Sequence, residues 1–211
     1  MEHTIMSQKT FRYFTHGDPE KARKIIFVLH GYGQLAEYFI RKFQGVNSDY
    51  FIVAPEGMHR FYLKGSSGRV GASWMTKEAR EQDIKDNIEW LEKLENEIYS
   101  NYDFDKKIIL GFSQGGATAA RWNKFGKKEA DHLLLWACVY PEDLDLNTDL
   151  LNKSNAKNHF ILGSQDEYFN LDQQKQILDF YSKKGFNTHT FNGKHTINEE
   201  TLFLLLEKIN S

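Results

Sequence analysis

The stretch of residues 108–122, IILGFSQGGATAARW, decides the fold. Its first three residues are apolar and predict a strand, GFSQGG contains the pattern G-x-S-x-G, and the remaining residues favour a helix. A strand, this turn and a helix in succession form a nucleophile elbow, which presents Ser113 as an attacking oxygen. Such a turn strains the serine backbone, and we expect Gly111 and Gly115 to lie against neighbouring strands, where a Cβ would clash. The alternative interpretation is a glycine-rich loop that opens a helix.

The composition favours one α/β domain that spans residues 1–211. Only three of the 211 residues are proline, no linker or low-complexity tract interrupts the chain, and the length suffices for a continuous core. The net charge is −2, so no basic field attracts nucleic acid or an anionic membrane. The longest apolar run, residues 133–140, is too short to span a bilayer, and we expect no stable membrane insertion.

The cysteine content and the amino terminus both indicate a cytoplasmic protein. Cys138 is the only cysteine, which excludes an internal disulfide and suits a reducing compartment. The first residues lack the basic and apolar regions of a secretory signal.

Short apolar runs alternate with longer amphipathic stretches, which predicts a mostly parallel sheet flanked by helices. The predicted strands are 24–29, 50–54, 107–110, 132–137, 159–162 and 188–191, with a weaker edge strand at 10–14. The predicted helices are 35–43, 77–99, 115–125, 171–184 and 198–209. Residues 58–74 form the only long irregular segment near the strand ends, so we expect minimal or no lid.

A second glycine motif, His30-Gly31-Tyr32-Gly33, follows the first central strand. Its glycines permit a sharp turn, and the N–H group of Tyr32 is a candidate donor to a developing oxyanion. The second candidate donor is the N–H group of Gln114, at the positive end of the helix behind the elbow. We interpret His30 as a structural histidine that supports this loop, in preference to a catalytic base.

An aspartate and a histidine follow two later strands. Asp166 lies in GSQD after the strand that ends at Leu162, and His195 lies in NGKH after the strand that ends at Phe191. Ligands bind at the carboxyl ends of the strands in such sheets. The order serine, aspartate, histidine predicts a triad in which His195 deprotonates Ser113 and Asp166 orients His195.

The remaining acids and histidines fit these roles less well. Asp143, Asp145 and Asp149 read as a polar loop, although one of them is an alternative acid. His189 lies inside a predicted strand. His159 opens a predicted strand. The other histidines precede or lie apart from the expected loops; they are His3, His16, His59 and His132.

On GFSQGG after a strand, the HGYG loop, Asp166 and His195, the sequence resembles the phospholipase/carboxylesterase family of α/β-hydrolases, which includes acyl-protein thioesterases. The resemblance covers residues 20–209. It implies the α/β-hydrolase fold and a serine hydrolase that cleaves carboxylic esters, with thioesters as a possible second class. We therefore expect small-molecule substrates and no cofactor.

The pair Ser73-Trp74 resembles the family's Ser-Trp element on the wall of the acyl site, which implies a substrate-binding role for Trp74. The family's thioesterases usually continue with Phe-Asp, where this chain has Met75-Thr76, and their loop HGLGD is here HGYGQ. We expect an open cleft walled by Trp74 and Tyr32 that accepts short-to-medium acyl esters.

Other functions remain as alternatives: a dienelactone-hydrolase-like enzyme, whose elbow usually carries cysteine, a peptidase, or a silent binding module with this fold. The segment 64–69, KGSSGR, lacks the Walker spacing of a phosphate loop, and we interpret it as a mobile loop near the substrate. The eight histidines include no pair at ligand spacing on one element, so we expect no metal.

Overall fold

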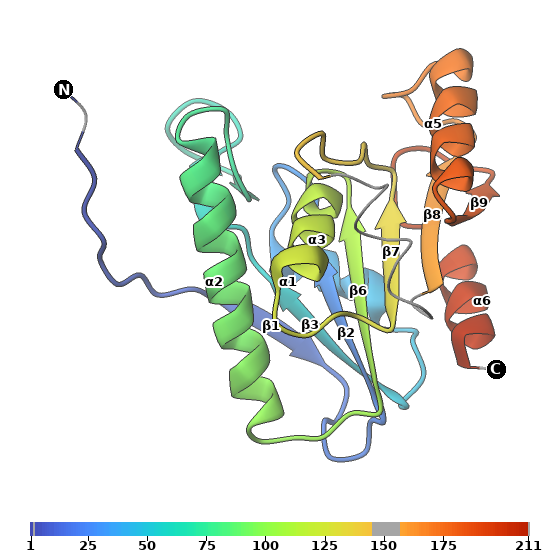
Figure 1. Ribbon diagram of the computed structural model, residues 1–211, viewed down its shortest axis with the longest axis horizontal. Helices are drawn as coiled ribbons and strands as arrows, with labels where there is room; N and C mark the ends of the chain where they lie inside the picture. The colour runs from blue at the N-terminus through green and yellow to red at the C-terminus, as the bar shows by residue number, and fades with distance from the viewer. Residues whose placement is uncertain (2, 145–156, 211) are drawn as a thin grey trace.

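The computed structural model describes residues 1, 3–144 and 157–210 and contains a central sheet of seven strands (Figure 1). The strands are β1 (Tyr13–His16), β2 (Lys24–Leu29), β3 (Tyr50–Pro55), β6 (Lys106–Phe112), β7 (His132–Trp136), β8 (Lys157–Gly163) and β9 (Asn187–Phe191). They lie in the order β1-β3-β2-β6-β7-β8-β9. Only β1 runs antiparallel to its neighbour. The mostly parallel sheet predicted from the sequence is therefore confirmed.

The central strands are apolar because both of their faces are covered. In β2 the last five residues are all fully buried, and β3 and β7 are buried along their whole length. Parallel strands with helices on both faces show this continuous apolar pattern. The ring of Phe27 on β2 packs edge-on against Trp122, with 5.0 Å between the ring centroids. This contact holds the helix that contains Trp122 against the sheet.

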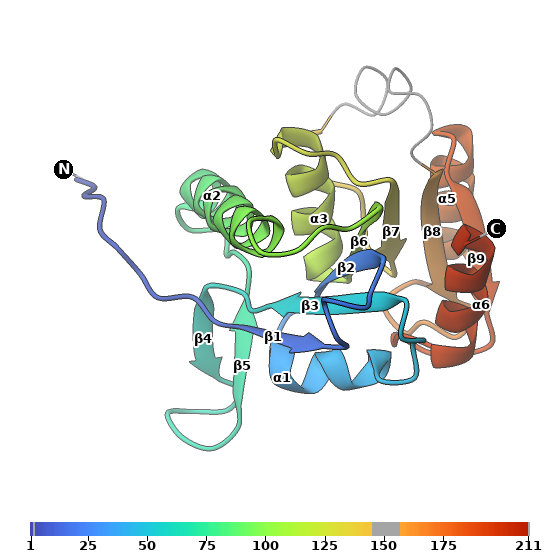
Figure 2. The ribbon, with the colours of Figure 1, turned by 90° about the horizontal axis from the view of Figure 1, so that it is seen from below.

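The helices lie where the sequence places them, with small shifts at their ends. They are α1 (Ala36–Phe39), the 3₁₀ helix η1 (Ile40–Phe43), α2 (Arg80–Tyr99), α3 (Gln114–Phe125), α5 (Leu171–Lys183) and α6 (Glu199–Asn210). Figure 2 shows α2 and α3 over one face of the sheet and α1 over the other. Helix α2 begins three residues later than predicted, after Ala79, which has a positive φ of 50°.

The segment 58–74 is not irregular, and that expectation was wrong. It forms a hairpin of β4 (His59–Tyr62) and β5 (Val70–Ser73), which stands apart from the sheet in Figure 2. A bridge between Gln34 and Ala72 connects the hairpin to the loop after β2. The turn between the two strands carries Gly65 and Gly68 at positive φ.

Candidate active site

Ser113 lies at a sharp turn between β6 and α3. Its φ of 52° and ψ of −122° place it in a region that non-glycine residues seldom adopt, at a cost of about 1–3 kcal/mol. The N–H group of Ser113 donates to the carbonyl of Trp136 at 2.9 Å, which ties the turn to the end of β7. The strained elbow predicted from the sequence is confirmed.

Two glycines permit this turn, for different reasons. A Cβ on Gly115 would lie 2.4 Å from the carbonyl oxygen of Leu29 on β2, as expected for a helix that begins against a strand. A Cβ on Gly111 would lie 2.5 Å from the carbonyl oxygen of Gly115, so this glycine makes room for α3 itself. The expectation that Gly111 faces a neighbouring strand was wrong in this detail.

His195 and Asp166 lie together in the loops after β9 and β8. His195 Nδ1 donates to Asp166 Oδ2 at 2.7 Å, since a carboxylate oxygen only accepts. The side chain of Asp166 is completely buried, and that of His195 is 13% exposed. The second carboxylate oxygen, Oδ1, accepts from the N–H group of Tyr168 at 3.0 Å. With Nδ1 bonded to Asp166, Nε2 is the ring nitrogen of His195 that can accept a proton.

Neighbouring residues hold the His195 loop in place. Glu167 accepts from the N–H group of His195 at 3.1 Å. Its own N–H group and that of His195 lower the pKa of Glu167 below its usual value. Trp136 Nε1 donates to the carbonyl of Thr196 at 3.0 Å, and Tyr168 covers the His195 ring at 4.4 Å between centroids. Sequence reasoning missed Trp136, Glu167 and Tyr168; the only signal for the last two is their position directly after Asp166.

The elbow and the histidine lie next to each other. The ring of Phe112, the residue before Ser113, is 4.9 Å from the ring of His195. Within the described residues, no hydrogen bond joins the Ser113 hydroxyl to His195. Such bonds are often long in enzymes without substrate and tighten when substrate binds.

The two candidate oxyanion donors are free to bind an acceptor in this part of the structure. Among the described residues, the N–H groups of Tyr32 and Gln114 have no protein acceptor. The Tyr32 loop is held from both sides, because Gly33 donates its N–H to Ala72 O at 2.9 Å and Gly31 donates to Gln34 Oε1 at 2.9 Å. Backbone N–H groups that are held rigidly and left free can receive a developing negative charge.

His30 is a structural residue, as expected. It is fully buried, its Nδ1 donates to Gly31 O at 2.8 Å, and its Nε2 accepts from the N–H group of Gly57 at 2.9 Å. Burial lowers the pKa of His30 to about 4. The ring is therefore neutral near pH 7, and both nitrogens hold the loop after β2.

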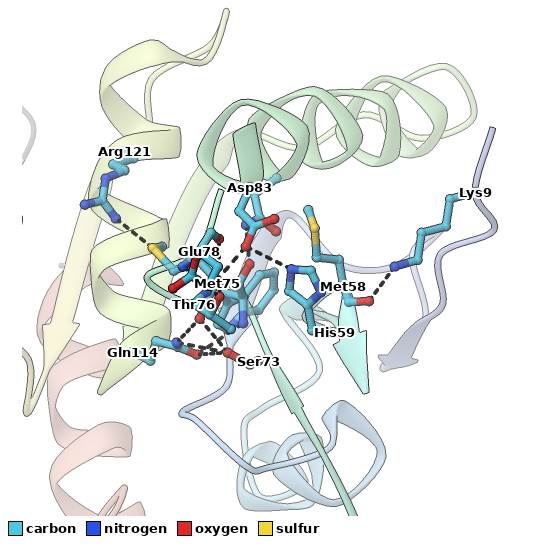
Figure 3. Close-up of polar contacts among 12 residues, drawn as sticks. Lys9, Met58, His59, Ser73, Met75, Thr76, Glu78, Asp83, Gln114 and Arg121 are labelled. Carbon is cyan, nitrogen blue, oxygen red and sulfur yellow. Dashed lines mark hydrogen bonds and ion pairs between the residues drawn. The ribbon is translucent and has the colours of Figure 1, made fainter. Parts of the chain in front are cut away.

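The Gln114 side chain joins the elbow to the end of the hairpin (Figure 3). Gln114 Nε2 donates to Ser73 Oγ at 3.0 Å and to Met75 O at 2.9 Å, and Gln114 Oε1 accepts from the N–H group of Trp74 at 3.1 Å. The Ser73-Trp74 element thus positions the residue that carries one candidate oxyanion donor.

Trp74 does not wall an open cleft, and the structure corrects that expectation. Its side chain is fully buried, its indole N–H donates to His30 O at 2.8 Å, and its ring lies 5.1 Å from the His30 ring. An indole in this position supports the glycine loop from beneath. Tyr32, by contrast, is 60% exposed and packs against Phe61 of the hairpin at 5.1 Å.

Asp143, the alternative acid, is bound elsewhere. Arg121 on α3 donates from Nε to Asp143 Oδ2 at 2.8 Å and from a terminal nitrogen to Oδ1 at 2.5 Å. The Arg121 guanidinium lowers the pKa of Asp143. Asp145 and Asp149 lie outside the described residues.

Two other histidines have partners away from Ser113. His189 Nε2 lies 3.0 Å from His159 Nδ1, and burial lowers the pKa of His189. His59 Nε2 donates to Asp83 Oδ2 at 2.9 Å, an interaction visible in Figure 3. Over the described ranges, no group of three or more histidine, cysteine, aspartate or glutamate side chains is arranged to hold a metal ion. No described helix has the length and apolarity that a membrane span requires.

Comparisons with known proteins agree with this fold. Residues 20–204 match the model of the FSH1 serine hydrolase family. A carboxylesterase from Mesorhizobium loti superposes with a TM-score of 0.73 and 16% identity, over 97% of this chain and 98% of its own. Esterase PE8 superposes with a TM-score of 0.70 and 18% identity, over 95% of this chain and 100% of its own. Acyl-protein thioesterase 2 from Zea mays superposes with a TM-score of 0.66 and 15% identity, over 94% of this chain and 97% of its own. At these identities the likeness shows the α/β-hydrolase fold. Curated proteins gave no match.

Proposed function

The chain belongs to the FSH1 serine hydrolase family, and from this membership we propose that it hydrolyses carboxylic esters with Ser113, His195 and Asp166 as its catalytic triad. The observation that carries the proposal is the 2.7 Å hydrogen bond from His195 to the buried Asp166, beside the strained turn at Ser113.

In the first half of the reaction, Ser113 Oγ attacks the ester carbonyl carbon while His195 Nε2 takes the hydroxyl proton. The carbonyl oxygen becomes negative, and the N–H groups of Tyr32 and Gln114 donate to it. The intermediate collapses when the carbon–oxygen bond to the alcohol breaks and His195 returns its proton to that oxygen. The acyl group is then bound to Ser113.

In the second half, water attacks the acyl carbon and gives a proton to His195. The bond to Ser113 Oγ breaks, the proton passes to this oxygen, and the carboxylic acid leaves. Asp166 accepts from Nδ1 throughout, which fixes the tautomer of His195 and stabilises its cation. A thioester would follow the same steps with a thiol as leaving group.

Labelling with a fluorophosphonate tests the proposal, because it modifies a serine only where base and oxyanion donors activate it. We expect one adduct by intact mass, mapped to Ser113 by peptide analysis and absent from Ser113→Ala. No adduct on folded protein, or an adduct on another residue, would contradict the triad. A parallel panel of esters, thioesters and peptides then separates esterase, thioesterase and peptidase activity.

We also propose small-molecule substrates and a cytoplasmic site of action. The single cysteine, Cys138, is buried against Tyr181, and burial raises its pKa to about 12, so it behaves as an inert thiol. Cell fractionation with an antibody to the chain tests the location; recovery in a secreted or membrane fraction would contradict it.

A further inference from the structure

An apolar groove of about 610 Å³ lies between α5 and the segment that follows β7. This volume falls within the range of roughly 300–1,000 Å³ that is usual for small-molecule sites. The side chains that matter for its shape are Val139, Tyr140, Leu144, Phe169, Ile177 and Phe180.

One wall of the groove begins at the elbow. The Trp136 carbonyl accepts the N–H of Ser113, and a Cβ on Gly116 would lie only 2.3 Å from Cys138 Sγ. The chain thus passes directly beside the first turn of α3 before it reaches Val139, which is 62% exposed in the groove.

The other wall begins at the catalytic histidine. Tyr168 covers the His195 ring, and the next residue, Phe169, lines the groove. Asn170 then caps α5 through a hydrogen bond from the N–H of Gln173 at 2.9 Å. The helix that carries Ile177 is therefore attached firmly to the loop that holds Asp166.

The groove is preformed. At its buried side, Tyr140 is 7% exposed and packs edge-on against Tyr181 at 6.2 Å. The ion pair between Asp143 and the buried Arg121 holds the post-β7 segment against α3. A ligand entering between these walls meets side chains that are already in place, which limits the entropy lost on binding.

We infer that this groove binds the acyl chain of the substrate while its carbonyl carbon lies at Ser113. The inference rests on the proposed esterase function. It adds that the groove binds the acyl side of the ester and not the alcohol side. Both walls start from residues that contact Ser113 or His195. Seven of the eleven lining residues are apolar and offer contact to an alkyl chain, and the other four are Glu142, Gln173, Gln176 and Lys184. In this orientation of the substrate, the exposed Tyr32 side chain lies beside the alcohol part of the ester.

A series of 4-nitrophenyl esters from acetyl to decanoyl, below their micelle concentrations, tests the inference. In the unmodified protein, kcat/KM should rise by up to about fourfold for each methylene that enters the groove, and then level off. Gln176→Trp places a large ring in the groove from an exposed position of α5. We expect it to lower kcat/KM for decanoyl at least tenfold and to leave acetyl within twofold.

Lys175→Trp is the matched control, because Lys175 is an exposed neighbour on the same helix that does not line the groove. It should leave the whole acyl series unchanged. Ile177→Trp repeats the test from a deeper position. Its control is Leu178→Trp, at a half-buried position of the same helix that does not line the groove.

A second series with a constant acetyl group and alcohols of increasing length tests the leaving-group side. If Gln176→Trp and Ile177→Trp alter this series and spare the acyl series, the groove binds the alcohol and the inference is overturned. Acyl profiles that match the controls overturn it as well. Absence of acetyl ester turnover and of fluorophosphonate labelling in the unmodified protein would instead refute the proposed function.

Discussion

The His195–Asp166 pair and the His59–Asp83 pair have the same chemistry and different surroundings. Their hydrogen bonds are 2.7 and 2.9 Å long. The Asp166 side chain is fully buried and that of His195 is 13% exposed, whereas those of Asp83 and His59 are 11% and 39% exposed. Both histidines therefore have a carboxylate partner, and the partner alone does not distinguish a catalytic base from a structural residue.

The serine beside each pair makes the difference. Ser73 lies in register with His59, but it is in an extended strand and its hydroxyl donates to Met75 O at 2.8 Å and accepts from Gln114. Ser113 lies at a strained turn, next to two N–H groups that have no acceptor in the described part of the chain. A nucleophile that is presented and supplied with oxyanion donors turns a histidine–carboxylate pair into a reactive site.

Removing the proposed nucleophile or the proposed base should have the largest effect. We expect Ser113→Ala and His195→Ala each to lower kcat on a soluble ester by about 10⁴–10⁶-fold, with the double variant little worse than either, because the triad acts as a unit. Steady-state kinetics on purified protein measures this. His59→Ala is the control from the second pair and should retain kcat within tenfold. Equal losses in His59→Ala and His195→Ala would break the comparison between the pairs.

The second-largest effect is expected from the carboxylates, because Asp166→Asn and Asp83→Asn should change kcat to different extents. Asp166→Asn keeps the shape of the side chain but no longer fixes the tautomer of His195, and we expect kcat to fall by about 10³–10⁴-fold. Asp83→Asn should change kcat by less than tenfold, since its partner faces no reactive serine. Retained helix and sheet content by circular dichroism separates these losses from unfolding. An inactive but folded Asp83→Asn would assign the second pair a role in turnover.

A third histidine, His30, extends the comparison to the pH dependence of the protein's stability. Its folded pKa of about 4 lies below the value near 6.5 of an unfolded histidine, so the unfolded chain binds more protons between these values. Stability therefore falls as pH decreases through this window. We expect His30 alone to contribute a loss of about 2 kcal/mol between pH 7.5 and pH 5. Urea unfolding of the unmodified protein and of His30→Gln measures it as the difference in slope; equal slopes would contradict a buried neutral His30.

The sequence predicted the elements that follow local rules. The run before Gly111 is apolar on both faces, and the placement of Ser113, Asp166 and His195 after β6, β8 and β9 requires only that the strands be recognised. The amphipathic spacing of α2 likewise determines its position within a few residues. These features depend on neighbours along the chain.

The features that were missed depend on contacts between distant segments. The hairpin has strands of only four residues, and its position depends on the hydrogen bond from Gly33 N–H to the Ala72 carbonyl and the one from Ala72 N–H to the Gln34 carbonyl. Trp74 faces inward because its indole reaches the His30 carbonyl, a partner 44 positions away. Tyr168 covers His195 only after two loops meet. Composition and periodicity carry no information on such pairings.

The smallest predicted effect concerns the function that we assign to the second pair, which is to fasten the hairpin to α2. The hydrogen bond between His59 and Asp83 is partly exposed, so solvent weakens it, and it should contribute about 0.5–1 kcal/mol to the free energy of unfolding. Asp83 also accepts from the N–H group of Thr76 at 3.3 Å, so that removal of His59 leaves the carboxylate one partner. A double-mutant cycle of His59→Ala and Asp83→Ala in urea unfolding isolates the pair from this second contact. A coupling energy near zero would mean that β4 is held by the strand pairing and the Ala72 contacts alone, and that the likeness between the two pairs ends at their hydrogen bond.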